Sequence, residues 1–145
     1  TSNKVKGAPV IVTKNNLVKS GGKAKAVIVN SKNANTCNAD GEEKALKMCG
    51  LAAGALGIKP EEVIVASTGV IGQVLPIEPI EKAVPQLVEK LSYNGNAEAA
   101  VAIMTTDTVK KEYAVEFEIG GKTCHLGGMA CATYCWEATS SWAAS

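Results

Sequence analysis

The stretch VIVASTGVIG, residues 63–72, decides the fold. Its first four residues are apolar and mostly β-branched, which predicts a buried strand. Small residues and glycines follow at once, so the strand ends in a turn whose backbone N–H groups are not covered by side chains. Such a turn can bind an anion or stabilise an oxyanion. From the residues alone, Thr68 and Gly69 also fit a plain strand-to-loop turn, which is the commoner use of such a sequence.

Strands and helices are expected on both sides of this segment. Apolar periodicity and turn residues predict strands at 8–13 and 23–29, helices at 40–56, 77–91 and 96–104, and a hairpin at 113–126. Asp40 is the expected N-cap of the first helix and Gly57 its left-handed C-cap, whereas Pro85 should kink or restart the second. The asparagine-rich segment 30–38 should be a structured loop. Together these elements predict one α/β domain.

Composition excludes several classes of protein. The chain has 145 residues, 46% hydrophobic and 20% charged, which is typical of a soluble globular domain. No run approaches the roughly 18 apolar residues that span a bilayer. The net charge is +1, so no nucleic-acid partner is expected. All basic side chains are lysines, so a substrate carboxylate would have to meet a lysine, a hydroxyl or backbone N–H groups.

The cysteines do not suggest a disulfide framework or a metal centre. Their number, five, is odd and their spacing irregular, which favours free thiols. Cys131 and Cys135 have only His125 nearby, short of the four ligands of a structural zinc site. No metal is therefore expected, and since the sequence has no Walker loop and no G-x-G-x-x-G motif, no cofactor is expected either.

Two further polar features are candidate sites. The TTDT cluster, residues 105–108, could line a polar pocket, although its hydroxyls could equally satisfy the last carbonyls of the preceding helix. His125 is expected to be a packed or surface histidine. The chain therefore offers a backbone-lined turn and a hydroxyl cluster, without a nucleophile–base pair.

Five segments in this order carry a resemblance to a known family. They are NKVKGAPV (3–10), VNSKNANTC (29–37), VASTGVIG (65–72), AIMTTDT (102–108) and GGKTCHLGGMA (120–130). The ordered set resembles the glutamate N-acetyltransferase family, also called ornithine acetyltransferases. On this resemblance, residues 1–130 should form the acetyltransferase α-chain domain, a layered α/β fold of the self-processing ornithine acetyltransferase type.

The resemblance implies an activity and partners. Family members cleave themselves before a threonine, which becomes the first residue of a β chain and the nucleophile. Acetyl passes from N-acetylornithine, or from acetyl-CoA in bifunctional members, through acetyl-threonine to glutamate, in arginine biosynthesis. A β chain is therefore the expected partner, in a heterodimer or heterotetramer, and a cytoplasmic location without membrane is implied.

Site residues carry over position by position. The Thr68 hydroxyl and the Gly69 N–H resemble the oxyanion-stabilising pair of the family, and Thr105 resembles a substrate-contacting residue. Lys32 departs from the pattern, because the family usually has glycine there. That change is expected to be minor unless the backbone needs a positive φ.

The segment after Ala130 departs more strongly. Cys131 stands where the family has a substrate-binding lysine, and no P-N-M-A-T cleavage site follows. Residues 131–145 are thus expected to be an aberrant tail. The chain is interpreted as an internal fragment or processed product that cannot form the acyl-enzyme alone and exposes apolar surface normally covered by a β chain.

Two alternatives remain open at the level of sequence. One is a non-catalytic small-molecule-binding domain that keeps the fold. The other is a self-processing amidase or aminopeptidase-like hydrolase with the same architecture, since fold does not fix function.

Overall fold

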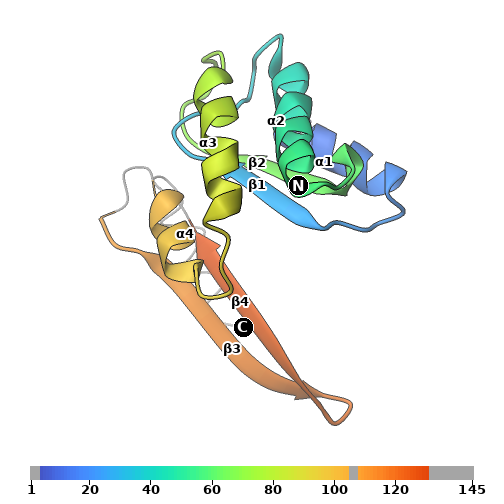
Figure 1. Cartoon of the computed structure of the whole chain (residues 1–145), viewed down its shortest axis with the longest axis vertical. Helices are drawn as coiled ribbons and strands as arrows, with labels where there is room; N and C mark the ends of the chain where they lie inside the picture. The colour runs from blue at the N-terminus through green and yellow to red at the C-terminus, as the bar shows by residue number, and fades with distance from the viewer. Residues whose placement is uncertain (1–3, 105–107, 131–145) are drawn as a thin grey trace. The chain divides into compact units, whose positions relative to one another are not determined.

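The structure, a computed structural model, describes residues 4–104 and 108–130 (Figure 1). The chain divides into two compact units, residues 1–92 and residues 93–145. The first contains α1 (Ala8–Lys19), β1 (Ala26–Asn30), α2 (Gly41–Leu56), the 3-10 helix η1 (Pro60–Glu62), β2 (Val63–Ser67) and α3 (Glu78–Glu89). The second contains α4 (Asn96–Ala102), β3 (Lys111–Ile119) and β4 (Lys122–Ala130). The α/β class is confirmed. The assignment of residues 1–130 to one acetyltransferase domain stays a prediction, and the expected tail at 131–145 lies outside the described residues.

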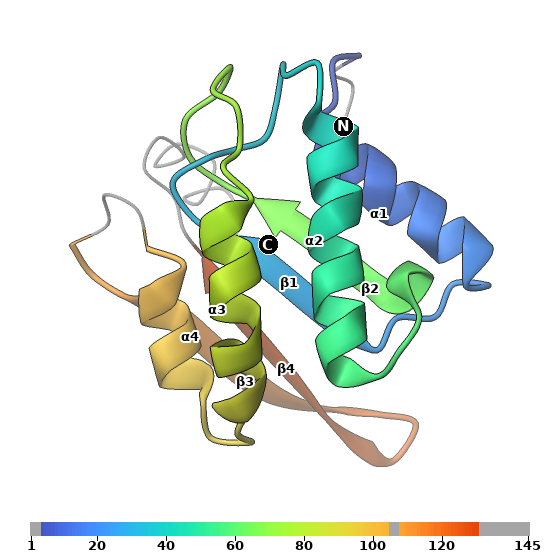
Figure 2. The same ribbon diagram turned by 45° about the horizontal axis from the view of Figure 1, so that its top comes forward.

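The first unit is built on a parallel pair of strands. β1 and β2 pair in register from Ala26 opposite Val63 to Asn30 opposite Ser67. Helices α2 and α3 lie on one side of this pair (Figure 2). The buried strand side chains join those of α2 in one hydrophobic cluster, whose members include Ile28, Val63, Val65, Met48 and Cys49. The buried strand predicted at the start of the VIVASTGVIG segment is therefore confirmed.

The strand expected at residues 8–13 is wrong, because this segment forms the first turns of helix α1. Pro9 occupies the first turn, where its missing N–H is harmless. Ala8, Val12 and Asn16 are all buried and recur every four residues, so the helix places them on one face. Packing against α2 and β2 thus overrides the strand preference of the Val-Ile-Val run.

Helix α1 closes the outer edge of β2. The Thr13 hydroxyl accepts the Val65 N–H at 3.1 Å and donates to the Val65 carbonyl at 3.0 Å. The Asn16 amide donates to the carbonyls of Val63 at 3.0 Å and Pro60 at 3.2 Å. These side chains take the place of a neighbouring strand, so this edge of the sheet is not open for further pairing.

Most other expected elements are confirmed, with changed boundaries. Helix α2 ends at Gly57 in the left-handed conformation, φ 66°. Helix α3 runs through Pro85 as one helix, so a restart there is wrong, whereas the alternative, a kink, stays a prediction. In the second unit, β3 and β4 form the predicted antiparallel hairpin, whose turn glycines Gly120 and Gly121 both have positive φ. No helix among the described residues is long and apolar enough to cross a membrane.

The described cysteines, Cys37, Cys49 and Cys124, are free thiols as expected. Cys49 is fully buried, and its burial raises the pKa of the thiol, although the hydrogen bond from the Asn16 amide acts in the opposite direction. This cysteine therefore stays protonated and serves as a core side chain.

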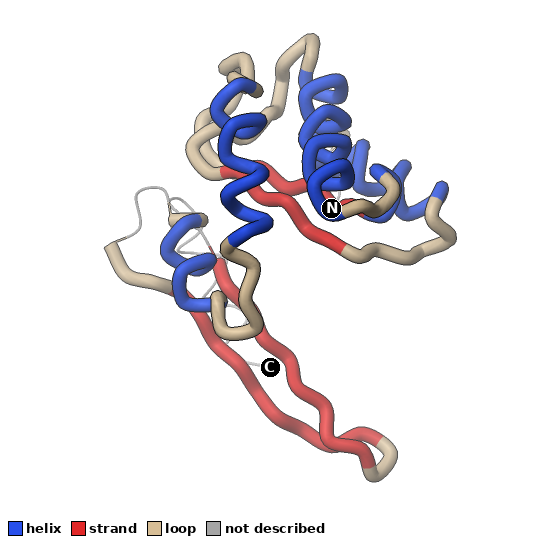
Figure 3. The backbone as a smooth tube through the Cα atoms, in the orientation of Figure 1, coloured by secondary structure: helices blue, strands red, loops and turns tan. Residues whose placement is uncertain are grey.

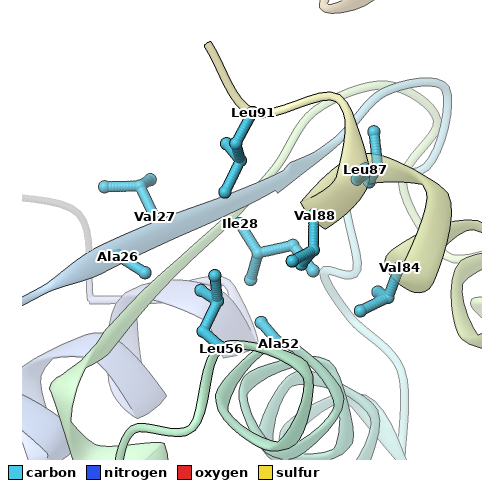
Figure 4. A pocket seen from close by; sticks show the side chains of 9 residues that line it. All are labelled: Ala26, Val27, Ile28, Ala52, Leu56, Val84, Leu87, Val88 and Leu91. Atoms are coloured by element: carbon cyan, nitrogen blue, oxygen red, sulfur yellow. The ribbon is translucent and has the colours of Figure 1, made fainter. Parts of the chain in front are cut away.

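Apolar surface remains uncovered within the first unit. On the face of β1 turned away from the core, Val27 and Val29 are 63% and 43% exposed. A shallow apolar hollow of about 90 Å³ lies between β1, α2 and α3, with Leu87 and Leu91 on its rim (Figure 4). The expectation that this chain exposes hydrophobic surface is confirmed for these residues.

We predict that Thr13→Val destabilises the first unit by about 2 kcal/mol, because it leaves the Val65 N–H and carbonyl without partners in a half-buried place. Urea unfolding followed by circular dichroism measures the change. Val10→Thr, at an exposed position of the same helix, is the control and should change stability by less than about 0.5 kcal/mol. Equal effects of the two variants would contradict this role of Thr13.

Candidate functional site

The segment after β2 runs beside the segment after β1 (Figure 3). Four backbone hydrogen bonds join them: Thr68 N–H to Asn30 O (3.1 Å), Val70 N–H to Lys32 O (3.0 Å), Ala34 N–H to Val70 O (2.9 Å) and Gly72 N–H to Thr36 O (2.9 Å). The parallel pairing of the strands is thus prolonged into both loops. This extension holds the predicted oxyanion turn against the asparagine-rich loop.

Gly69 is in direct contact with the neighbouring loop. Its φ is 128°, and a Cβ built on it would lie 2.1 Å from the carbonyl carbon of Lys32 and 2.6 Å from the nitrogen of Asn33. Real Cβ atoms do not come this close to backbone. Only glycine therefore fits at this position, for a reason of packing as well as of backbone conformation.

The two predicted donors remain available at the surface. Gly69 is exposed and Thr68 is half-buried. Neither the Gly69 N–H nor the Thr68 hydroxyl is hydrogen-bonded to any other residue in the described part of the chain. An N–H and an O–H on adjacent residues can serve one oxygen atom that becomes negatively charged, provided that the atom lies about 2.7–3.1 Å from both.

Buried asparagines hold the opposing loop in place. The Asn33 amide donates to the carbonyls of Gln73 (3.1 Å) and Val74 (3.2 Å), and its side-chain oxygen accepts the Asn35 N–H (2.8 Å). The Asn35 amide donates to the carbonyl of Gly41 at the start of α2 (2.8 Å). The sequence predicted a structured loop here but did not identify these anchors, and the density of asparagines was the only signal for them.

Lys32 lies directly opposite Gly69 and has a left-handed backbone, φ 82°. A residue with a Cβ pays about 1–2 kcal/mol in this region, where glycine is unstrained. The backbone at Lys32 thus has the positive φ under which, as expected from the sequence, a lysine in place of the glycine implied by the resemblance is not a minor change. Lys32 is exposed and is also the only charged side chain in segments 30–38 and 67–74.

The other candidates are placed less favourably. Thr105 and most of the TTDT cluster lie outside the described residues. His125 is 73% exposed in its side chain, and its Nδ1 lies 3.4 Å from the carboxylate of Glu116 across the hairpin. This agrees with the expected surface role. Residues 4–104 and 108–130 contain no group of three or more His, Cys, Asp or Glu that could hold a metal ion.

Fold and turn together define an α/β protein whose parallel strand pair ends in a surface turn suited to an anionic group. A family model for the ArgJ family matches residues 1–132. The chain therefore belongs to the ArgJ family, in agreement with the resemblance found in its sequence.

Individual relatives agree with this assignment. The chain is 49% identical over 131 residues to the arginine biosynthesis bifunctional protein ArgJ of Gloeobacter violaceus, and 44% identical to the glutamate N-acetyltransferase of Methanocaldococcus jannaschii. Each match covers 90% of this chain but 32% of the relative, so the chain spans about a third of their length. The matched part is the N-terminal part of the relatives.

Two solved structures share the fold. One is the arginine biosynthesis bifunctional protein argJ from Bacillus halodurans, with a TM-score of 0.79. The other is the ornithine acetyltransferase from Mycobacterium tuberculosis complexed with ornithine, with a TM-score of 0.82. Both are 36% identical to this chain, cover 92% of it, and are themselves covered over 70% and 71% of their lengths.

We predict that Gly69→Ala destabilises the first unit by about 2–4 kcal/mol, because the new methyl group overlaps the Lys32 carbonyl and the φ of 128° is unfavourable for alanine. Thermal unfolding measures the effect. The matched control is Gly54→Ala in α2, where the added methyl meets nothing within 4 Å and should stabilise the helix by about 0.5–1 kcal/mol. A Gly69→Ala protein as stable as the parent chain would refute the close contact.

We also predict that Lys32→Gly raises the stability of the first unit by about 1 kcal/mol, since glycine relieves the left-handed strain. Lys32→Ala is the control, because it removes the charge but keeps the strain, and it should change stability by less than about 0.5 kcal/mol. Chemical denaturation compares the two. A stabilisation by both variants would point to charge rather than strain.

Proposed function

We propose that this chain is the α-chain part of a glutamate N-acetyltransferase. The enzyme moves acetyl from N-acetylornithine to glutamate through an acetyl-threonine on a β chain. The observation that carries the proposal is the turn at Thr68 and Gly69, which presents a hydroxyl and an N–H at the surface. The relative from Methanocaldococcus jannaschii bears the name of this activity.

In this proposal the turn stabilises the tetrahedral intermediates of acetyl transfer. Attack on the acetyl carbonyl places negative charge on its oxygen, which then accepts hydrogen bonds from the Gly69 N–H and the Thr68 hydroxyl. The contact with Lys32 fixes Gly69 before substrate arrives, so little reorganisation is needed during the reaction. Thr105 is proposed to contact the substrate.

The nucleophile is proposed to come from a β chain of the same precursor. This chain covers about 70% of the solved chains but only about a third of the full-length relatives, so the solved chains are much shorter than full-length proteins. That difference fits a family whose members are divided into two chains. The exposed Val27 and Val29 supply apolar surface that such a partner would cover.

Further properties follow from the same proposal. Residues 1–130 form the α-chain domain, the location is cytoplasmic, and no cofactor is needed because the threonine carries the acetyl group. A bifunctional form of the enzyme would also accept acetyl-CoA as donor. The relative from Gloeobacter violaceus is named a bifunctional protein, which supports this wider donor range.

The proposal is tested by co-expressing this chain with the C-terminal remainder of the Gloeobacter violaceus relative. We expect the two to co-purify, and N-acetylornithine to add one acetyl group to the partner but none to this chain, as read by mass spectrometry. In the assembled enzyme, Thr68→Val should lower the transfer rate by about 10²–10³. Thr123→Val, at an exposed position of the hairpin, is the control and should leave the rate unchanged.

Two results would contradict the proposal. A gain of one acetyl group on the isolated chain would show that the nucleophile lies within it. A stable complex that binds N-acetylornithine without transferring acetyl would favour the non-catalytic binding domain instead.

A further inference from the structure

Lys32, the only charged residue in segments 30–38 and 67–74, is held in a strained conformation. Lys32 has a φ of 82°, and its carbonyl group forms the surface against which Gly69 packs. The same carbonyl accepts the Val70 N–H at 3.0 Å. These contacts hold the backbone of Lys32 in place, so the strain persists in the folded protein. Residues that keep a strained backbone in the folded state cluster at functional sites.

Within residues 4–104 and 108–130, no charged group neutralises Lys32 through an ion pair. No other residue in segments 30–38 and 67–74 carries a charge, and asparagine, serine, threonine and glutamine supply the remaining polar groups. Lys32 is exposed and makes no ion pair with another described residue. Its ammonium group is therefore free to bind an anion, on a stem long enough to reach over the adjacent turn.

The chain has no arginine, so a planar bidentate contact with a carboxylate is excluded within it. An amino-acid substrate whose acetyl oxygen meets the Thr68 and Gly69 donors must still place its α-carboxylate a few bonds away. The backbone of Lys32 lies against Gly69, and Lys32 is the only cationic residue in segments 30–38 and 67–74.

We propose that Lys32 is a substrate-binding residue whose ammonium group pairs with the α-carboxylate of the acylated amino acid held at the Thr68–Gly69 turn. This inference rests on the proposed function and adds to it the residue that recognises the carboxylate. Lys32 makes the turn selective for an acid over the corresponding neutral amide. The left-handed strain is the structural consequence of placing a charged side chain where glycine fits better.

The test compares two ligands that differ in one charge. The full 145-residue chain, labelled with ¹⁵N, is titrated with N-acetylornithine and with its α-carboxamide, and the amide signals of Thr68 and Gly69 are followed by NMR. We expect the acid to bind about three- to five-fold more tightly than the amide, as is usual for an exposed ion pair. Raising the salt concentration should reduce this ratio.

Variants at one position separate charge from structure. Lys32→Gln keeps the Cβ and the strain but loses the charge, and it should bring the ratio close to one. Lys32→Arg keeps the charge and should preserve the ratio. Lys14→Gln, at an exposed position of α1, is the matched control for net charge and should also preserve it.

The outcomes distinguish this inference from the proposed function. If the Thr68 and Gly69 signals respond equally to acid and amide, or if Lys32→Gln keeps the preference, the role of Lys32 is refuted while the site itself stands. If neither ligand moves these signals, the site assignment fails, and the role of Lys32 fails with it.

Discussion

The parallel pairing that continues beyond β1 and β2 is the constraint on which the first unit depends. Strands alone would leave the following loops free, but the hydrogen bonds that join Val70 to Lys32 and to Ala34 carry the pairing onward. The two backbones then come so close at Gly69 that no side chain can stand between them. A turn held in this way is rigid before any ligand binds, which is what stabilisation of a developing charge requires.

The asparagine side chains supply hydrogen-bond partners to backbone groups that the close approach of the two loops would otherwise leave unpaired. Asn33 and Asn35 are buried, and their amides satisfy carbonyl groups of the turn and of the start of α2. Left unpaired, such carbonyls would each cost about 1–3 kcal/mol. On the opposite edge, Thr13 and Asn16 do the same for β2. A two-stranded sheet is thus completed by side chains rather than by further strands.

The sheet is nonetheless covered on one side only within the first unit. Parallel strands usually have both faces buried, and Val27 and Val29 keep the apolar character of such a face while remaining exposed. This incompleteness agrees with a chain that spans about a third of its full-length relatives. The turn likewise supplies only part of a catalytic site. It offers a pair of hydrogen-bond donors, but no nucleophile or base lies beside it in sequence.

The sequence by itself determined those features that depend on local chemistry. The periodicity of 40–56 and the glycine that follows it specify α2 and its C-cap, and the apolar run before Ser67 specifies β2. The motif order was enough to identify the family, and Thr68 and Gly69 were found as candidate donors. Apart from the motif order, which is read along the whole chain, each of these depends on neighbours within a few residues.

Tertiary structure decided what depends on contacts between distant segments. The Val10 to Val12 run suits a strand or a helix, and only the fit of Val12 and Thr13 against α2 and β2 selects the helix. Nothing near Lys32 in sequence shows that its φ is positive, because its backbone is held by pairing with the loop around Gly69, thirty-seven positions away. Backbone approach between distant segments is not encoded in local propensity, and this is why the strained lysine beside the turn was recognised only in the folded chain.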